Sequence, residues 1–319
     1  MRSRRGVALV AALWLVVAIA TVALQFSIEA RERRTVGILT SERGIQRAAA
    51  LGALAFTQAR LEQALRVAPT GTNVQRLRSS DPWMDVDSVY SGPVLVDSMQ
   101  VDVVARDLGE RLNINRANET QLQTFFSFLL GDYSKATQLA QAIMDWRDAD
   151  SIPRPSGAER DAYIKAGMLA LPTNTPFREI EELQHVMGMT PEVYSTVSPY
   201  LTTHGTAAVN LNTAPVAVLR ALPGMTDATL NRILQLRSQG QRIANVAQVF
   251  PAMAGGRRLP GQVARLTASN QLNAQASVNT TEVELTIISR VGPQAPPTKL
   301  IAVIARQGAT TATVRTKLW

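Results

Sequence analysis

The 319-residue chain contains no cysteine and only two histidines, His185 and His204. Without cysteine, neither a disulfide framework nor a thiolate metal site or nucleophile is available. The histidines lie in different segments, and the sequence has no H-E-x-x-H spacing, G-x-S-x-G motif, P-loop or dinucleotide fingerprint. We therefore predict that the protein is not an enzyme.

The charge of the chain is strongly positive, with a formal net charge of +8. Such an excess can indicate a nucleic-acid partner. Here, however, the positive residues are nearly all arginines scattered along the chain, and three of them, Arg2, Arg4 and Arg5, stand at its start. The charge therefore predicts solubility and membrane topology rather than nucleic-acid binding.

The start of the chain carries an apolar run without any charge, over residues 7–28. At about 1.5 Å per residue, a helix of this run reaches roughly 33 Å, enough to cross a hydrocarbon core. The arginines before the run keep the amino end in the cytoplasm and send the rest of the chain across. The prediction is a single-pass membrane protein whose C-terminal part lies on the far side of the membrane from the cytoplasm.

Three interpretations of this segment compete. A secretory signal could be cleaved around residues 18–20, and a plain anchor would not be cleaved at all. The third is cleavage after Gly6, which leaves the apolar helix on a chain that begins at Val7. A basic leader, a glycine and an apolar helix resemble the class III leader of type IV pilins and type II secretion pseudopilins. In that family a membrane peptidase cuts after the glycine and methylates the new terminal amine, here that of Val7.

The chain after the apolar run is predicted to have an α+β fold. Helical spacing of leucines and many alanines continue the first helix to residue 68. Apolar alternating runs predict strands at both ends of the remaining chain, over residues 94–96, 99–103, 283–288, 300–304 and 311–318. The middle reads as helical, so the simplest topology is one sheet interrupted by an inserted all-α domain. The predicted division is a leader (1–6), an N-terminal helix (7–68), a sheet domain (69–115 and 271–319) and the inserted domain (116–270).

The inserted domain contains a repeat, because residues 112–117 recur as residues 209–214. Two further segments, 188–190 and 224–226, both read Gly-Met-Thr between helices. These look like helix–hairpin–helix repeats, with glycine at a tight connection where φ is positive. Such hairpins bind DNA through backbone N–H groups, so a membrane-anchored DNA-binding protein is an alternative function. Thr190 and Thr226 replace the second glycine of that hairpin and speak against it.

The densest group of carboxylates lies in a loop with two prolines. Asp148 and Asp150, with Glu159 and Asp161 returning across the loop, predict an oxygen cage for Ca²⁺. The spacing is not that of an EF-hand. The alternative is a solvated loop in which the acids pair with Arg147 and Arg154.

The same loop carries a specific family resemblance. Residues 146–150, 153–159 and 161–163 resemble the signature of the type II secretion minor pseudopilin K family (general secretion pathway protein K, GspK). Residues 112–115, 200–202 and 209–214 match that family as well. The resemblance implies a pilin-like sheet with a large inserted helical domain, and calcium sites within that domain.

The function implied by the resemblance is structural. Family members cap the tip of the periplasmic pseudopilus with the minor pseudopilins I and J, among other pseudopilus subunits, and serve export across the outer membrane. The prepilin peptidase is the expected processing partner. Most pilins carry glutamate at the fifth mature position, whereas Ala11 stands there in this chain. A subunit without that carboxylate has no neighbour's amine to neutralise, which suits the first subunit of a filament. A type IV pilus minor pilin is an alternative within the same class.

Overall fold

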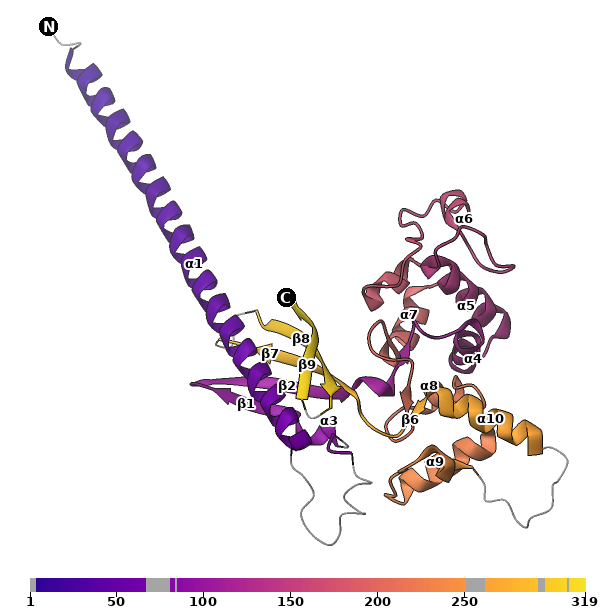
Figure 1. Cartoon of the computed structure of the whole chain (residues 1–319). Coiled ribbons are helices and arrows are strands. Elements are labelled where there is room, and N and C mark those ends of the chain that lie inside the picture. Colours follow the sequence, from indigo (N-terminus) through magenta and orange to yellow (C-terminus); the bar gives the residue numbers. More distant parts are fainter. Residues whose placement is uncertain (1–3, 67–80, 84, 251–261, 292–295, 309) are drawn as a thin grey trace.

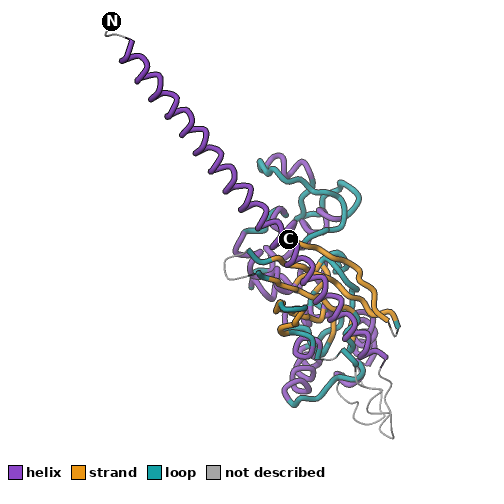
Figure 2. Tube along the Cα trace, turned by 90° about the vertical axis from the view of Figure 1, so that its left-hand side faces the viewer, coloured by secondary structure: helices purple, strands orange, loops and turns teal. Residues whose placement is uncertain are grey.

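In the computed structural model, described over residues 4–66, 81–83, 85–250, 262–291, 296–308 and 310–319, the chain begins with one long helix. Helix α1 (Arg4–Arg66) has 63 residues and projects far beyond the rest of the molecule (Figures 1 and 2). From Ala12 onward its apolar part is long and hydrophobic enough to cross a membrane, and none of that stretch is buried by the protein. Its large apolar side chains, such as Trp14 and Phe26, are therefore exposed. This helix is consistent with membrane anchoring.

The C-terminal half of α1 packs on a five-stranded antiparallel sheet. The strand order is β1-β2-β7-β8-β9. The bounds are Gly92–Val96 for β1, Met99–Asp107 for β2, Glu282–Ser289 for β7, Thr298–Gln307 for β8 and Thr310–Leu318 for β9. The helix turns small residues, Ala49, Ala50 and Ala53, toward the sheet. Small side chains let a helix approach a sheet closely, so the sheet covers this half of α1.

The core under α1 is built from both ends of the chain. Alternate residues of β2 and β7 are buried, as expected for strands with one covered face. Trp83 is fully buried beside the sheet, and its indole Nε1 donates to the carbonyl oxygen of Leu61 at 3.1 Å. Each large side chain buried here contributes about 1.5–3 kcal/mol. The predicted sheet and its interruption are confirmed, because β2 and β7 pair directly across the inserted segment.

The inserted segment forms a second, separate hydrophobic core. Its helices are α4 (Glu119–Leu130), α5 (Tyr133–Arg147), α6 (Arg160–Lys165), α7 (Pro191–Val197), α8 (Val216–Arg220), α9 (Asp227–Ser238) and α10 (Gln262–Gln275). Short 3-10 turns lie at Ile180–His185 and Val246–Val249, and a one-turn helix, α3 (Val86–Val89), precedes β1. This segment lies beside the sheet rather than under α1 (Figure 1).

Two two-stranded parallel pairs divide the helical domain into two units. Strand β3 (Leu112–Asn113) pairs with β4 (Leu201–Thr202), and β5 (Val209–Asn210) pairs with β6 (Ala276–Ser277). Each pair closes a unit by joining its first residues to its last. The sequence repeat at residues 112–117 and 209–214 therefore marks the start of each unit.

One asparagine organises each unit in the same way. Asn115 Nδ2 donates to the carbonyls of Phe177 (2.8 Å) and Thr203 (3.0 Å), and its Oδ1 accepts the N–H of Phe177 (2.9 Å). Asn212 Nδ2 donates to the carbonyls of Ile243 (3.0 Å) and Val278 (2.9 Å), and its Oδ1 accepts the N–H of Ile243 (2.9 Å). Three backbone groups of distant loops are thus satisfied by one side chain.

An arginine at the end of the second helix completes the shared framework. Arg147 donates to the carbonyls of Ile114 and Ala117, and Arg237 donates to those of Leu211 and Ala214. Burial lowers the pKa of each guanidinium to about 10, so both remain charged at neutral pH. The two units are therefore structural repeats that share buried hydrogen bonds as well as sequence.

The structural repeat pairs the glycine hairpins differently from the way the sequence comparison paired them. Gly188 and Gly224 both have positive φ, +85° and +76°, as predicted, and a threonine cap follows each. When the two units are aligned by their asparagine and arginine contacts, however, Gly224 corresponds to Gly131. Gly131 joins α4 to α5 and has a φ of +68°. The sequence comparison paired Gly188 with Gly224 because residues 188–190 and 224–226 are identical. The helix–hairpin–helix assignment itself stays a prediction.

The asparagine framework is testable with Asn115→Ala. The variant leaves the N–H of Phe177 and two carbonyls without their partner, so we expect a loss of about 2–3 kcal/mol in the free energy of unfolding. Trp146 is stacked on Phe177 at 6.1 Å, so urea denaturation of the full chain in detergent can be followed by tryptophan fluorescence. The control is Asn231→Ala on the exposed side of α9, with an expected change within about 0.5 kcal/mol. Equal stability of the two variants would contradict the framework.

Candidate metal centre

The acidic loop predicted from the sequence connects α5 to α6. Asp148 follows the last residue of α5, and Glu159 directly precedes the first residue of α6. Asp150 lies between them in an exposed turn. The two helix ends thus bring together carboxylates that are eleven positions apart.

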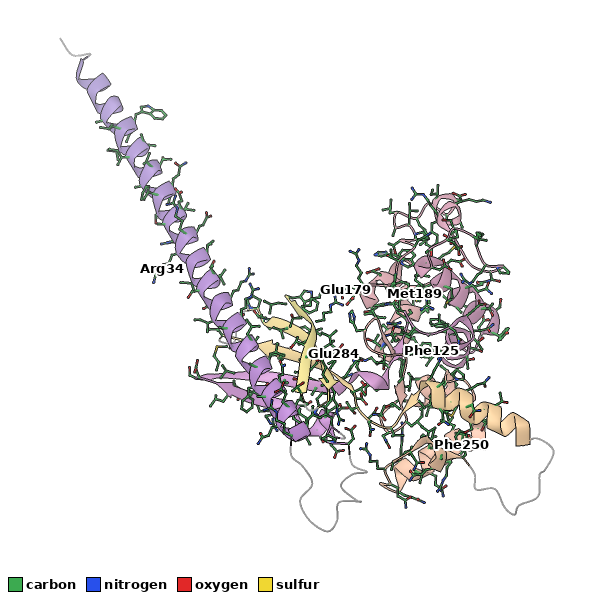
Figure 3. The ribbon with its side chains drawn as sticks, in the orientation of Figure 1. Arg34, Phe125, Glu179, Met189, Phe250 and Glu284 are labelled. Atoms are coloured by element: carbon green, nitrogen blue, oxygen red, sulfur yellow. The ribbon has the colours of Figure 1, made fainter. Side chains whose placement is uncertain are left out.

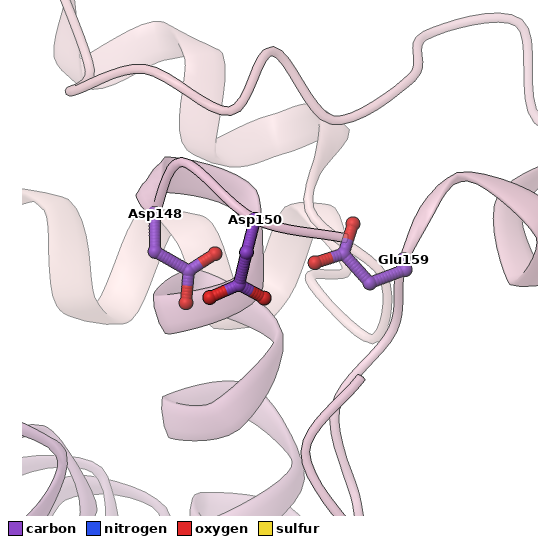
Figure 4. A group of neighbouring side chains, drawn as sticks. All are labelled: Asp148, Asp150 and Glu159. Carbon is purple, nitrogen blue, oxygen red and sulfur yellow. The ribbon is translucent and has the colours of Figure 1, made fainter. Parts of the chain in front are cut away.

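Three of these carboxylates form a compact group (Figure 4). One oxygen from each of Asp148, Asp150 and Glu159 lies within 4.8 Å of the others. Asp150 is exposed, Asp148 is half-buried and Glu159 is buried, with 6% of its surface accessible. The fourth predicted ligand, Asp161, is not part of this group, since it is exposed in the first turn of α6. The predicted four-carboxylate site is therefore a three-carboxylate group, because α6 starts at Arg160 and carries Asp161 away from the loop.

Three buried oxygens of this group lack a hydrogen-bond partner. Both carboxylate oxygens of Glu159 and Oδ1 of Asp148 are buried without a hydrogen bond. Burial, with further repulsion from Asp145 and Asp148, raises the pKa of Glu159 above its ordinary value. An unsatisfied buried carboxylate is costly, and a bound cation satisfies it directly.

One arginine partly balances the charge. Arg154 Nη1 lies 2.5 Å from Oδ1 of Asp145 and 2.6 Å from Oδ2 of Asp148, and its Nε lies 3.6 Å from Oε2 of Glu119. The predicted pairing of Asp145 and Asp148 with Arg154 is thus present alongside the three-carboxylate group. Arg147 does not take part in it, because its guanidinium points at the carbonyls of the repeat framework.

Two residues outside the predicted ligand set shape the site. Asp145 is completely buried and fixes the loop through Arg154, whose backbone N–H also donates to Asp145 Oδ2 at 3.1 Å. Gly157 leaves room for that carboxylate, since a Cβ at this position would stand 2.0 Å from Asp145 Oδ2. The glycine of Pro155-Ser156-Gly157 was the available signal, although a close approach cannot be read from composition.

The chemistry of the group suits a hard cation. Three carboxylates offer oxygen ligands only, which Ca²⁺ prefers to nitrogen or sulfur. The unpartnered oxygens of Asp148 and Glu159 are the atoms that would bind it, with Asp150 closing the group from the solvent side.

A second polar cluster fastens the helical domain to the sheet (Figure 3). Glu179 of the helical domain pairs with Arg315 and with Lys317 of β9, the latter at 3.1 Å. Burial opposes ionisation of Glu179, but these partners outweigh it and lower its pKa. On the other side, Asp107 at the end of β2 accepts hydrogen bonds from Asn210 and Thr213, both at 2.7 Å. The domain is therefore attached at both β2 and β9.

The predicted processing site lies at the beginning of α1. Gly6 and Val7 fall within the helix bounds, and their side chains lie outside the described residues. Cleavage after Gly6 and methylation of Val7 remain predictions.

The fold places three parts in a definite arrangement. A membrane-length helix continues onto an antiparallel sheet, and a helical domain is inserted between two paired strands. Residues 101–206 match the family "Type II secretion system (T2SS), protein K". The resemblance found in the sequence is confirmed.

Individual relatives agree with the family match. The chain is 36% identical over 123 residues to "Type II secretion system protein K" of Dickeya chrysanthemi, and 32% identical over 111 residues to that of Klebsiella pneumoniae. These alignments cover 36% and 33% of this chain, and 33% and 34% of the relatives. The matched part thus spans about a third of the length of the curated relatives.

The similarity of fold extends much further than the similarity of sequence. A chain in the crystal structure of the GspK-GspI-GspJ complex from enterotoxigenic Escherichia coli matches with a TM-score of 0.61. The match covers 91% of this chain and 99% of that chain at 17% identity. The α+β fold with an N-terminal helix and an antiparallel sheet is confirmed.

The close approach at Gly157 gives a stability prediction. In Gly157→Ala the added methyl group clashes with the buried Asp145 carboxylate, so we expect the free energy of unfolding to fall by about 2 kcal/mol or more. Ser156→Ala is the matched control, because the N–H of Ser156, which donates to Gln141, is unchanged. Thermal denaturation of the two variants measures the difference. A Gly157→Ala protein as stable as the control would show that the loop does not depend on this contact.

Proposed function

We propose that this chain is a minor pseudopilin of the type II secretion system, which caps the tip of the periplasmic pseudopilus and is needed for protein export across the outer membrane. The observation that carries the proposal is the match of residues 101–206 to the protein K family, within a chain whose fold is similar over almost its whole length. The partners would be subunits of the kinds named I and J, since the similar chain belongs to a GspK-GspI-GspJ complex. The role is structural rather than enzymatic.

The exposed surface of α1 supports assembly into a filament. Beyond the apolar window that begins the helix, Val36, Ile38, Leu39 and Ile45 remain exposed, at 40–62% of their surface. A large apolar surface on a single helix becomes stable in water only when it contacts another apolar surface. Helices of neighbouring subunits would supply that surface once α1 leaves the bilayer. The anchor would place the protein in the inner membrane with its folded part in the periplasm.

The attachment of the helical domain supports a capping role. Ion pairs at Glu179 and hydrogen bonds at Asp107 hold the domain to two strands of the sheet, β9 and β2. A domain fixed beside the sheet in this way adds bulk to the head of the subunit. Such a subunit would leave no room for another one above it and would end the filament.

The hairpins give little support to the alternative function of DNA binding. The hydroxyls of Thr190 and Thr226 accept the N–H groups of Val193 and Thr229, which a DNA-binding hairpin would offer to a phosphate. A Cβ at Gly224 would stand 2.2 Å from the carbonyl oxygen of Ala268, so this hairpin packs against α10. We therefore favour the pseudopilin role over a DNA receptor.

The same proposal includes a calcium site at Asp148, Asp150 and Glu159. Its support is the compact group of three carboxylates, with the orphaned oxygens of Glu159 and Asp148. Bound Ca²⁺ would supply two positive charges where the protein has buried negative charge. It would tie the end of α5 to the start of α6.

Processing is the first test of the proposed function. We expect the protein recovered from membranes to begin at methylated Val7, as measured by intact mass. Gly6→Val places a branched side chain at the cleavage position, so we expect it to retain its leader. Ser3→Val, within the leader, is expected to be processed as the wild type. In a strain lacking this chain, export through the type II system should be lost, and only the processed forms should restore it.

Two outcomes would contradict the pseudopilin role. A wild-type chain that begins at residue 21 would be a soluble secreted protein. An uncut Met1 combined with normal export in the deleted strain would leave a plain membrane anchor. In that case salt-sensitive binding to duplex DNA would be the next property to measure.

Calcium binding has its own test by calorimetric titration of the metal-free protein. We expect Glu159→Gln to weaken Ca²⁺ binding by a factor of about ten or more, equal to about 1.4 kcal/mol, because it removes the buried ligand. Asp161→Asn is the control, since Asp161 lies outside the group; its affinity should stay near that of the wild type. Equal losses in both variants would show only a general effect of negative charge.

A further inference from the structure

The acidic loop is an addition to one of two repeated units. In the second unit the framework arginine, Arg237, is followed six positions later by Ile243, whose N–H and carbonyl bind the framework asparagine. In the first unit, Arg147 and the equivalent Phe177 are separated by 30 positions. The second unit shows that the asparagine and arginine contacts form without a long segment between them. The additional segment of the first unit, between Arg147 and Phe177, must therefore be held in place by contacts of its own.

The outer part of this segment is not held by apolar packing. Ile152, Ile164 and Leu169 are exposed to 75%, 55% and 102% of their reference surface. The inner part is anchored at Tyr163, which is fully buried and whose hydroxyl accepts the N–H of Met187 at 2.8 Å. The turn between α5 and α6 therefore depends on polar contacts.

Arg154 makes the central polar contacts of that turn. Its guanidinium and backbone N–H both bind Asp145, which is completely buried at the end of α5. The same Nη1 lies 2.6 Å from Oδ2 of Asp148, a member of the three-carboxylate group. The positive charge of the Arg154 side chain thus holds the α5–α6 turn against the end of α5.

A cation in the three-carboxylate group would need the carboxylate that Arg154 already uses. Asp148 has one oxygen on Arg154 and the other unpartnered, beside the unpartnered oxygens of Glu159. A divalent ion at these oxygens would stand close to the guanidinium, and like charges in a partly buried site repel each other. Asp145 and Glu119 are alternative partners that would keep Arg154 in place without Asp148.

We propose that Arg154 is a built-in cation that holds the α5–α6 turn in the metal-free protein and competes with Ca²⁺ for Asp148. When Ca²⁺ binds, Arg154 remains with Asp145 and Glu119, and the metal takes over the carboxylate of Asp148. The arginine lowers the affinity for Ca²⁺ and keeps the turn folded when the metal is scarce. This inference rests on the calcium site proposed above and is independent of the role in export.

The test compares Arg154→Gln with Arg160→Gln in the full-length protein in detergent. Arg160 is exposed and next to Glu159 in the sequence, so its removal changes the charge near the site without touching Asp148. We expect Arg154→Gln to bind Ca²⁺ about tenfold more tightly than the wild type by calorimetry. Arg160→Gln should change the affinity by no more than about twofold, because an exposed charge is screened. Thermal denaturation should show Arg154→Gln to be less stable than the wild type without Ca²⁺, and close to it with saturating Ca²⁺.

Several results would overturn the inference. If Arg154→Gln and Arg160→Gln raised the Ca²⁺ affinity equally, Arg154 would act only as one of the positive charges near the site and not as a competitor for Asp148. Weaker binding in Arg154→Gln would make the arginine a positioning residue for the ligands instead of a competitor. No binding by the wild type and Arg154→Gln alike would remove the calcium site, while the export assay would still judge the pseudopilin role. If Arg154→Gln does not fold, Arg154→Met keeps the apolar stem of the side chain without its charge, and it should bind Ca²⁺ more tightly than the wild type.

Discussion

The pairing of β2 with β7 joins residues on opposite sides of the inserted domain, such as Val103 and Ile287. Every other part of the structure depends on it. The pairing completes the sheet on which α1 lies, and it forces the inserted domain to leave and return at neighbouring strands. Closing so large a loop costs conformational entropy, but that cost grows only slowly with loop length. The insertion can therefore be large and still leave the sheet intact.

The two units of the inserted domain are stabilised by the same set of buried contacts. In each unit a buried asparagine satisfies loop backbone groups, and a buried arginine satisfies the carbonyls of the entry turn. Buried polar groups are stable only when their partners are present, so these contacts specify one arrangement of the loops. The acidic turn departs from this pattern, since both carboxylate oxygens of Glu159 and Oδ1 of Asp148 are buried without a hydrogen bond. A bound cation would satisfy these oxygens.

The sequence predicted the elements whose signals are local. The uncharged run at residues 7–28 identified the apolar part of α1, and apolar runs identified β2, β7, β8 and β9 within a few residues. The acidic loop was also found, because carboxylates near prolines and glycine form a dense local pattern. Asp161 was grouped with the others because sequence spacing cannot show that α6 has begun at Arg160. The equivalence of Gly224 with Gly131 was missed for a related reason, since it depends on contacts between loops rather than on similar residues.

The sequence alone determined that one helix is long and apolar enough for a membrane, that strands flank a helical middle, and that oxygen ligands concentrate in one loop. Hydrophobic runs, periodicity and composition carry these properties directly. Only the tertiary structure decided which carboxylates meet, which of them are buried, and that Arg154 already occupies one of them. Those properties arise from the meeting of α5, α6 and the framework of the repeat, and burial and pairing of charges exist only once the chain has folded.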